Sequence, residues 1–230
     1  MNENVIWSFL MAQIKNPYGV AGLMGNLYVE SKLDSSLLQS SYARKLGMSS
    51  YEYTEAVDSG AYTNFVHDSA GYGLAQWTYW SRKEALLNAA RKCGCSVGDL
   101  SMQLSFLWTE IQKYTTVVNT LKSATSVREA SDIVAVKYEK PADISEKALQ
   151  NRATFGQKYY DMFVKRNYKQ VVVTSNSVNI RCGNSKDYSK YGQAQKNDTF
   201  RWVATSDNNW HAIEYQNKVA WISGEFSKVE

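Results

Sequence analysis

The sequence is poor in the residues that build metal centres and disulfide frameworks. It has only 2 histidines and 3 cysteines among 230 residues. A zinc enzyme needs two or three histidines or equivalent ligands at suitable spacing, whereas His67 and His211 lie in parts of the chain with different patterns. The cysteines, Cys93, Cys95 and Cys182, are odd in number, and two of them are separated by one residue. We therefore expect reduced thiols with a structural role.

The sequence also lacks a long apolar run and a strong excess of charge of one sign. A membrane-spanning helix needs about 18 or more consecutive apolar residues; the sequence has no such run, so we expect no membrane insertion. The N-terminus carries Glu3 and has no basic region followed by an apolar run, so we expect no signal peptide. The net charge of +4 is small and dispersed, which does not favour nucleic acid as a partner.

Aromatic residues, in contrast, are abundant, with 7 Trp and 16 Tyr. Many of them will lie in a core. Exposed aromatic rings, however, stack well on sugar rings and on flat polymer surfaces, so the excess suggests a carbohydrate or polymer ligand.

The pattern of apolar residues changes near residue 166. Before it the spacing is helical, and we expect helices over residues 4–14, 17–30, 81–93, 98–112, 126–138 and 145–165. Asn16 and Pro17 supply an N-cap and a proline at the first position of the second helix. Residues 40–70 are polar and irregular, and short helices or a small hairpin are expected there.

After residue 168 apolar and polar residues alternate with a period of two, and turn residues separate the runs at short intervals. Only β structure fits this pattern. The predicted fold class is α+β: a mainly α domain over residues 1–165, a short linker, and a small all-β barrel over residues 168–230.

Two motifs in the helical part carry candidate chemistry. The first, Gly-Asn-Leu-Tyr-Val-Glu-Ser at residues 25–31, puts Glu30 on the last turn of the second predicted helix. An apolar face and the negative end of a helix disfavour a charged carboxylate, so we expect Glu30 to be kept as a proton donor. The second, Gly-Tyr-Gly-Leu-Ala-Gln-Trp at residues 71–77, is rich in glycine, which lets backbone approach a ligand closely.

The second motif also offers ligand-binding side chains. Gln76 can hydrogen-bond to sugar N-acetyl or hydroxyl groups, and Tyr72, Trp77 and Trp80 can stack on sugar rings.

In combination and order, the two motifs resemble those of the phage tail-type lysozyme family and, more distantly, those of lytic transglycosylases and goose-type lysozymes. The similarity covers roughly residues 4–160, including Arg82, residues 104–110 and the Tyr-Glu-Lys-Pro stretch at 138–141. The resemblance implies a lysozyme-like domain that cleaves the β-1,4 bond between N-acetylmuramic acid and N-acetylglucosamine without a metal or organic cofactor.

The resemblance also implies site residues. Glu30 would be the catalytic acid, with Gln76 and Tyr72 lining the cleft. A second carboxylate is less well defined. Asp34, Asp58 and Asp68 lie beside or between the motifs, and Asp68 is the first choice because the irregular lobe would hang over the cleft. In the transglycosylase-like relatives a single Glu suffices, first as acid and then as base.

Residues 168–230 resemble a bacterial SH3-type cell-wall-binding domain, through a Ser-Val-Asn-Ile-Arg segment at 177–181 and a Val-Ala-Trp-Ile segment at 219–222. Candidate contacts with wall peptides are Tyr188, Tyr191, Trp202 and Trp210, although a position in the barrel core is also expected for Trp210.

These resemblances suggest an endolysin of a phage or prophage with a Gram-positive host. The expected partners are peptidoglycan glycan strands and wall peptides, and the expected state is a monomer. Without a signal peptide, the protein would stay in the host cytoplasm until it is released to the wall, or would be carried on a virion.

Three other functions stay open. A lytic transglycosylase would give 1,6-anhydro products. A wall peptidase or amidase is disfavoured by the histidine count, and by Cys93 and Cys95 following a helix C-terminus, where a thiolate is not stabilised. A wall-binding protein without catalytic activity is the third.

Overall fold

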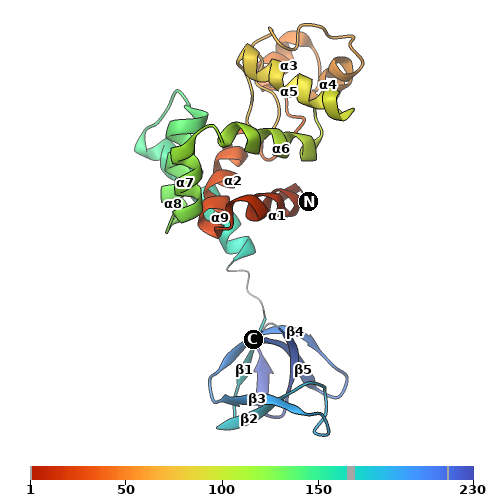
Figure 1. Ribbon diagram of the computed structural model, residues 1–230, viewed down its shortest axis with the longest axis vertical. Coiled ribbons are helices and arrows are strands. Elements are labelled where there is room, and N and C mark those ends of the chain that lie inside the picture. Colours follow the sequence, from red (N-terminus) through yellow and green to blue (C-terminus); the bar gives the residue numbers. More distant parts are fainter. Residues whose placement is uncertain (1, 165–168, 217) are drawn as a thin grey trace. The chain divides into compact units, whose positions relative to one another are not determined.

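The computed structural model describes residues 2–164, 169–216 and 218–230. It divides into two compact units, Met1–Val164 and Lys165–Glu230. Within the described residues the first unit is helical and the second is an antiparallel β-sheet (Figure 1), which confirms the predicted α+β class. The predicted linker after residue 165, and the end of the helix predicted to reach that residue, lie outside the described residues.

The helical unit contains more helices than the sequence pattern predicts. In chain order they are α1 (Asn2–Ile14), α2 (Pro17–Ser31), α3 (Ser40–Leu46), α4 (Ser50–Asp58), α5 (Trp80–Cys93), α6 (Leu100–Ile111), α7 (Thr115–Ser123), α8 (Val127–Val134), the π-helix η1 (Ala135–Glu139) and α9 (Glu146–Phe163). Among the helices described, none is long and apolar enough to cross a membrane.

Helix α2 is the buried centre of this unit. It starts as predicted, with the Asn16 side chain accepting a hydrogen bond from the Tyr18 N–H (3.1 Å) and with proline at the first turn. It packs against α8 and α9 at very short range, because a Cβ on Gly22 would lie 2.6 Å from the Cβ of Ala130 and one on Gly25 would lie 2.4 Å from a backbone oxygen of α9. Glycine at these two positions allows the close packing.

The helices α3, α4 and α5 form a lobe, and α6 lies between this lobe and the remaining helices (Figure 1). The irregular segment therefore folds as short helices and not as a hairpin. Three buried aromatic rings fill the lobe, and the centroids of Tyr53 and Phe65 lie 5.6 Å from that of Tyr72.

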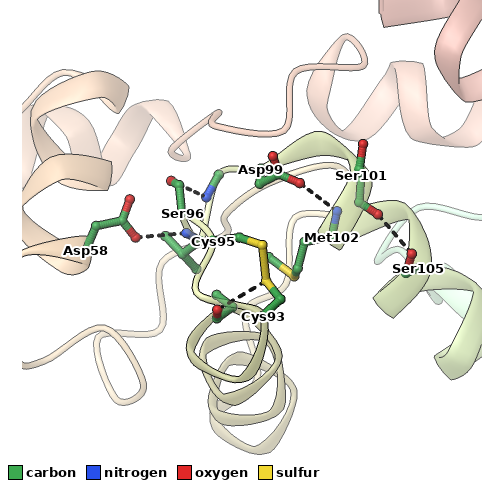
Figure 2. The surroundings of a disulfide bond; sticks show 11 residues. Asp58, Cys93, Cys95, Ser96, Asp99, Ser101, Met102 and Ser105 are labelled. Atoms are coloured by element: carbon green, nitrogen blue, oxygen red, sulfur yellow. Dashed lines mark hydrogen bonds between the residues drawn. A yellow bond between two sulfur atoms is a disulfide. The ribbon is translucent and has the colours of Figure 1, made fainter.

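The structure overturns one expectation about the cysteines. Cys93, the last residue of α5, forms a disulfide with Cys95 (Figure 2), and only Cys182 is a free thiol within the described residues. Gly94 adopts a positive φ of 66° as the helix C-cap and bends the chain, so that the two Cα atoms are 5.3 Å apart. Cysteine spacing alone could not reveal this bend.

The second unit is a seven-stranded sheet of β1 (Gln170–Val173), β2 (Ser177–Arg181), β3 (Lys190–Gln195), β4 (Thr199–Thr205), β5 (Trp210–Tyr215), β6 (Lys218–Ser223) and β7 (Ser227–Val229). Its strand order is β3-β2-β6-β5-β4-β1-β7, with antiparallel neighbours. The strands surround a small core of alternating aliphatic side chains: Val171, Val173, Val178, Ile180, Ala194, Ile213, Ala220 and Ile222.

Candidate active site

Glu30 lies on the last turn of α2, as the sequence predicts, but its surroundings are not purely apolar. Its Oε1 accepts a hydrogen bond from Nη2 of Arg152 on α9 at 2.7 Å. The same guanidinium donates through Nη1 to Oδ1 of Asn26, one turn earlier on α2 (3.1 Å). The Glu30 side chain keeps 22% of its surface exposed, so a firmly held carboxyl group still reaches solvent.

The exposed side of Glu30 faces a pocket of about 460 Å³. The chain segments around it come from α2, from the residue that precedes α3, from the glycine-rich motif and the residues after it, from the start of α5 and from the end of η1. They contribute Glu30, Gln39, Gly71, Ala75, Gln76, Thr78, Tyr79, Arg82 and Glu139. The two sequence motifs therefore meet at one pocket.

The glycine-rich motif gives this pocket a polar wall. A Cβ on Gly71 would lie 2.8 Å from Oε1 of Gln76 and 3.3 Å from Oε1 of Gln39, so any side chain there would displace these amides. Gln76 itself has a positive φ of 44° and donates from Nε2 to the carbonyl oxygens of Leu37 (3.0 Å) and Gly73 (3.1 Å). Such backbone strain persists only where surrounding bonds fix it, and it is common at functional sites.

A second carboxyl group, Glu139, lines the same pocket. It is the last residue of η1, and Lys140, which follows with a positive φ of 51°, donates its N–H to the Ala135 carbonyl. Oε1 of Glu139 is buried and has no hydrogen-bond partner among the described residues. Burial and the negative charge of Glu30 raise the pKa of Glu139 to about 8, against the opposing positive charges nearby.

A third carboxyl group, Glu110 on α6, lies behind the pocket and binds the lining residue Arg82. It accepts hydrogen bonds from Trp77 Nε1 (2.7 Å), from Arg82 (2.9 and 3.0 Å) and from the Tyr138 hydroxyl (2.9 Å). Burial alone would raise the pKa of Glu110, but these donors and the charge of Arg82 lower it. Glu110 is therefore a fully paired anion that holds Arg82 at the pocket.

Sequence reasoning did not select Glu139 as a site residue, although the resemblance includes its Tyr-Glu-Lys-Pro stretch. The feature of the sequence that could have indicated Glu139 is its position at a predicted helix end, directly before a Lys-Pro pair. The π-helix η1, which brings Glu139 to the pocket that Glu30 also lines, has no pattern in the sequence.

Asp68, the first choice for a second carboxylate, does not line the Glu30 pocket. It is buried in the lobe, where it accepts hydrogen bonds from Lys83 Nζ and from the hydroxyl groups of Tyr53 and Tyr62. The other two candidates have local roles: Asp34 accepts from the Ser36 N–H, and Asp58 accepts from the Val97 N–H next to the disulfide (Figure 2). The structure thus places each of the three in backbone or lobe contacts.

Of the four proposed sugar-binding side chains, the structure brings only Gln76 into the pocket. Tyr72 and Trp77 are fully buried in the core, where Tyr72 shares a hydrogen bond with Thr54 and Trp77 donates to Glu110. Trp80 is 48% exposed at the start of α5 but is not among the lining residues, whereas its neighbour Tyr79 is.

In the β unit, the four residues proposed to contact the wall differ in their exposure to solvent. Tyr188 and Tyr191 are exposed. Trp202 is partly buried against the aliphatic core and donates from Nε1 to the Thr205 hydroxyl, and Trp210 is buried.

A helical domain with two carboxyl groups on one open, polar pocket has the arrangement that glycosidases use, since a carboxylic acid protonates the leaving oxygen while a second carboxyl supports the reaction. The family model of phage tail lysozyme matches residues 1–163, and the chain belongs to this family. The helical unit is therefore a lysozyme-like peptidoglycan hydrolase. No curated protein matches the chain.

Proposed function

We propose that this protein cleaves the β-1,4 bond between N-acetylmuramic acid and N-acetylglucosamine in Gram-positive cell walls, with Glu30 as the general acid. The observation that carries the proposal is that Glu30, held by Arg152, opens onto a pocket that also contains Glu139. Glu30 would protonate the leaving oxygen, and the negative charge that remains would stabilise an oxocarbenium-like transition state.

The polar wall of the pocket suits this substrate. Gln39 offers its side-chain amide, Gln76 its Oε1 and Thr78 its hydroxyl oxygen to the hydroxyl and N-acetyl groups of a sugar, and Tyr79 offers an exposed ring for stacking. Contacts of this kind orient the glycosidic oxygen toward Glu30.

A lytic transglycosylase is the second candidate. Glu139 keeps one carboxyl oxygen buried, which leaves Glu30 as the better placed group to act first as acid and then as base. The attacking group could then be the C6 hydroxyl of the muramic acid, and the product would carry a 1,6-anhydro ring.

The first test is the loss of turbidity of purified Gram-positive walls. Glu30→Gln keeps the size of the side chain and removes the acid, so we expect activity to fall by at least about 100-fold, the usual contribution of a general acid. Glu84→Gln is the matched control, since Glu84 is an exposed residue of α5 outside the pocket, and should keep full activity. Full activity of Glu30→Gln would remove Glu30 from the mechanism.

For the β unit we propose an SH3-type cell-wall-binding domain. Its exposed Tyr188 and Tyr191 support a role in contacting wall peptides. The combination of a wall-cleaving and a wall-binding unit favours an endolysin that acts at host lysis over a lysin carried on the virion tail, and a setting in which the protein waits in the host cytoplasm.

A further inference from the structure

Around the pocket, carboxyl groups outnumber the guanidinium groups that could pair with them. Three carboxyl groups, Glu30, Glu110 and Glu139, meet two guanidinium groups. Arg152 is bound to Glu30, and Arg82 is bound to Glu110. Of these three carboxyl groups, Glu139 is the one that lacks an ion-pair partner among the described residues, and its Oε1 lacks a hydrogen-bond partner as well.

Glu139 is half-buried, and its buried Oε1 has no partner among the described residues; a carboxylate oxygen in such a position disfavours the charged form and favours a bound proton. The groups that face Glu139 come from four helices: Glu30 on α2, Arg82 on α5, Glu110 on α6 and Arg152 on α9. Tyr138, on the same π-turn, adds a hydroxyl group that is already committed to Glu110. The two negative neighbours and the shelter from solvent favour a neutral Glu139.

We propose that Glu139 stores the proton that Glu30 delivers, so that the two carboxyl groups hold one proton between them at neutral pH. This inference rests on the proposed function of Glu30. Glu30 is the catalytic residue, and Glu139, which lines the same pocket but keeps its Oε1 buried, is a positioning residue that acts through it. Two interacting carboxyl groups that share a proton titrate as a pair.

Over one turnover, the two carboxyl groups donate one proton and regain one. When the bond between the anomeric carbon and the leaving oxygen breaks, that oxygen takes the proton from Glu30, and the proton held by Glu139 reaches Glu30 through water in the pocket that both residues line. Both carboxyl groups are then negative while the anomeric carbon is positive. The oxygen of an attacking water, or of the C6 hydroxyl, bonds to this carbon and releases one proton, which restores the pair.

The proposal can be tested through the pH above which activity falls. The raised pKa of Glu139, about 8, implies that the pair keeps its last proton up to about that pH. Glu139→Gln has the shape of the protonated acid but cannot store a proton, and it leaves Glu30 alone beside Arg152. We expect the basic limb of the kcat/KM profile to move to lower pH by at least about one unit, with a loss of at least about threefold at pH 7.5 and a smaller loss at pH 5.

Two variants serve as controls in the same assay. Glu139→Asp keeps a carboxyl group and should retain a basic limb closer to that of the wild type. Glu84→Gln, on the exposed surface of α5, should have the wild-type profile. An unchanged profile for Glu139→Gln, with Glu30→Gln inactive, would overturn the role of Glu139 and leave the proposed function intact. An active Glu30→Gln would instead overturn the proposed function.

If Glu139→Gln does not fold, the proposal can still be tested by an NMR titration of the wild-type protein, which does not depend on enzymatic activity. In wild-type protein carrying ¹³C-labelled glutamate side chains, carboxyl-carbon NMR should detect one carboxyl group that titrates near pH 8. Where the variants fold, Glu139→Gln should abolish this transition. A wild-type spectrum in which every glutamate titrates below pH 6 would overturn the inference.

Discussion

At the scale of single residues, two sheltered carboxyl groups differ in their partners. Asp68 accepts hydrogen bonds from a buried lysine and two tyrosines, whereas Oε1 of Glu139 has no partner among the described residues. Buried polar groups are normally paired, so an unpaired one calls for a functional explanation. This contrast is why we assign a structural role to Asp68 and a role in proton storage to Glu139.

The role of Asp68 can be tested through stability. Asp68→Asn would leave Lys83 buried without a counter-charge, and breaking such a pair typically lowers the free energy of unfolding by about 3–5 kcal/mol. Urea unfolding should detect this loss, while the folded fraction keeps its wall-clearing activity. Asp58→Asn, which affects one backbone hydrogen bond in the same lobe, should lose about 1 kcal/mol. A stable but inactive Asp68→Asn would restore Asp68 as the second catalytic carboxylate.

At the scale of elements, the site depends on how closely α2 and α9 approach. Gly25 lies where α2 meets the backbone of α9 next to Arg152, and Arg152 holds Glu30. The packing of these two helices therefore sets both the stability of the unit and the position of the acid.

Gly25→Ala tests this dependence. Its Cβ would lie 2.4 Å from the Arg152 carbonyl oxygen and 2.5 Å from the Gly156 nitrogen, so the two helices must separate. We expect the free energy of unfolding to fall by about 1–3 kcal/mol or more despite the higher helix propensity of alanine. Ser8→Ala, on the exposed face of α1, should change it by less than about 0.5 kcal/mol. Thermal unfolding compares the two, and equal stabilities would contradict the packing described.

The local signals in the sequence predicted α2 well but could not predict every element. Pro17, the N-cap and the apolar spacing fix α2 by short-range effects. Helix α7 was not predicted, because its threonines and valines have low helix propensity; it is a helix because Val117 and Leu121 are buried against the core. Tertiary packing decides such a segment, and it has no signature in the local sequence.

The same limit applies to the site. The two motifs predicted Glu30 and Gln76 as site residues, and both line the pocket, Glu30 from a helix end and Gln76 from a glycine-rich turn. The partners of Glu30 come from residues more than 100 positions away in the chain, as with Arg152. The buried pairing of Asp68 with Lys83 is likewise a contact between segments, and the expected position of the irregular lobe over the cleft could not reveal it.

At the scale of the whole molecule, the chain combines two units with separate cores. The pocket lies entirely within the helical unit, since all its lining residues precede residue 140. Cleavage and wall binding should therefore be separable.

A chain ending at Val164 tests this separation. We expect it to bind purified walls more weakly in a pelleting assay and to clear them more slowly, while its turnover of short soluble glycan fragments stays within a factor of about two of the full chain. Loss of turnover on the soluble fragments would show that the β unit contributes to the active site.

The most direct test of the account is the mass of the products that wild-type protein and Glu30→Gln release from purified Gram-positive walls. The account predicts fragments that end in N-acetylmuramic acid, reducing after hydrolysis or 1,6-anhydro after transglycosylation, and their loss in Glu30→Gln. Fragments cut at the stem peptide, or an equal yield from Glu30→Gln, would contradict it.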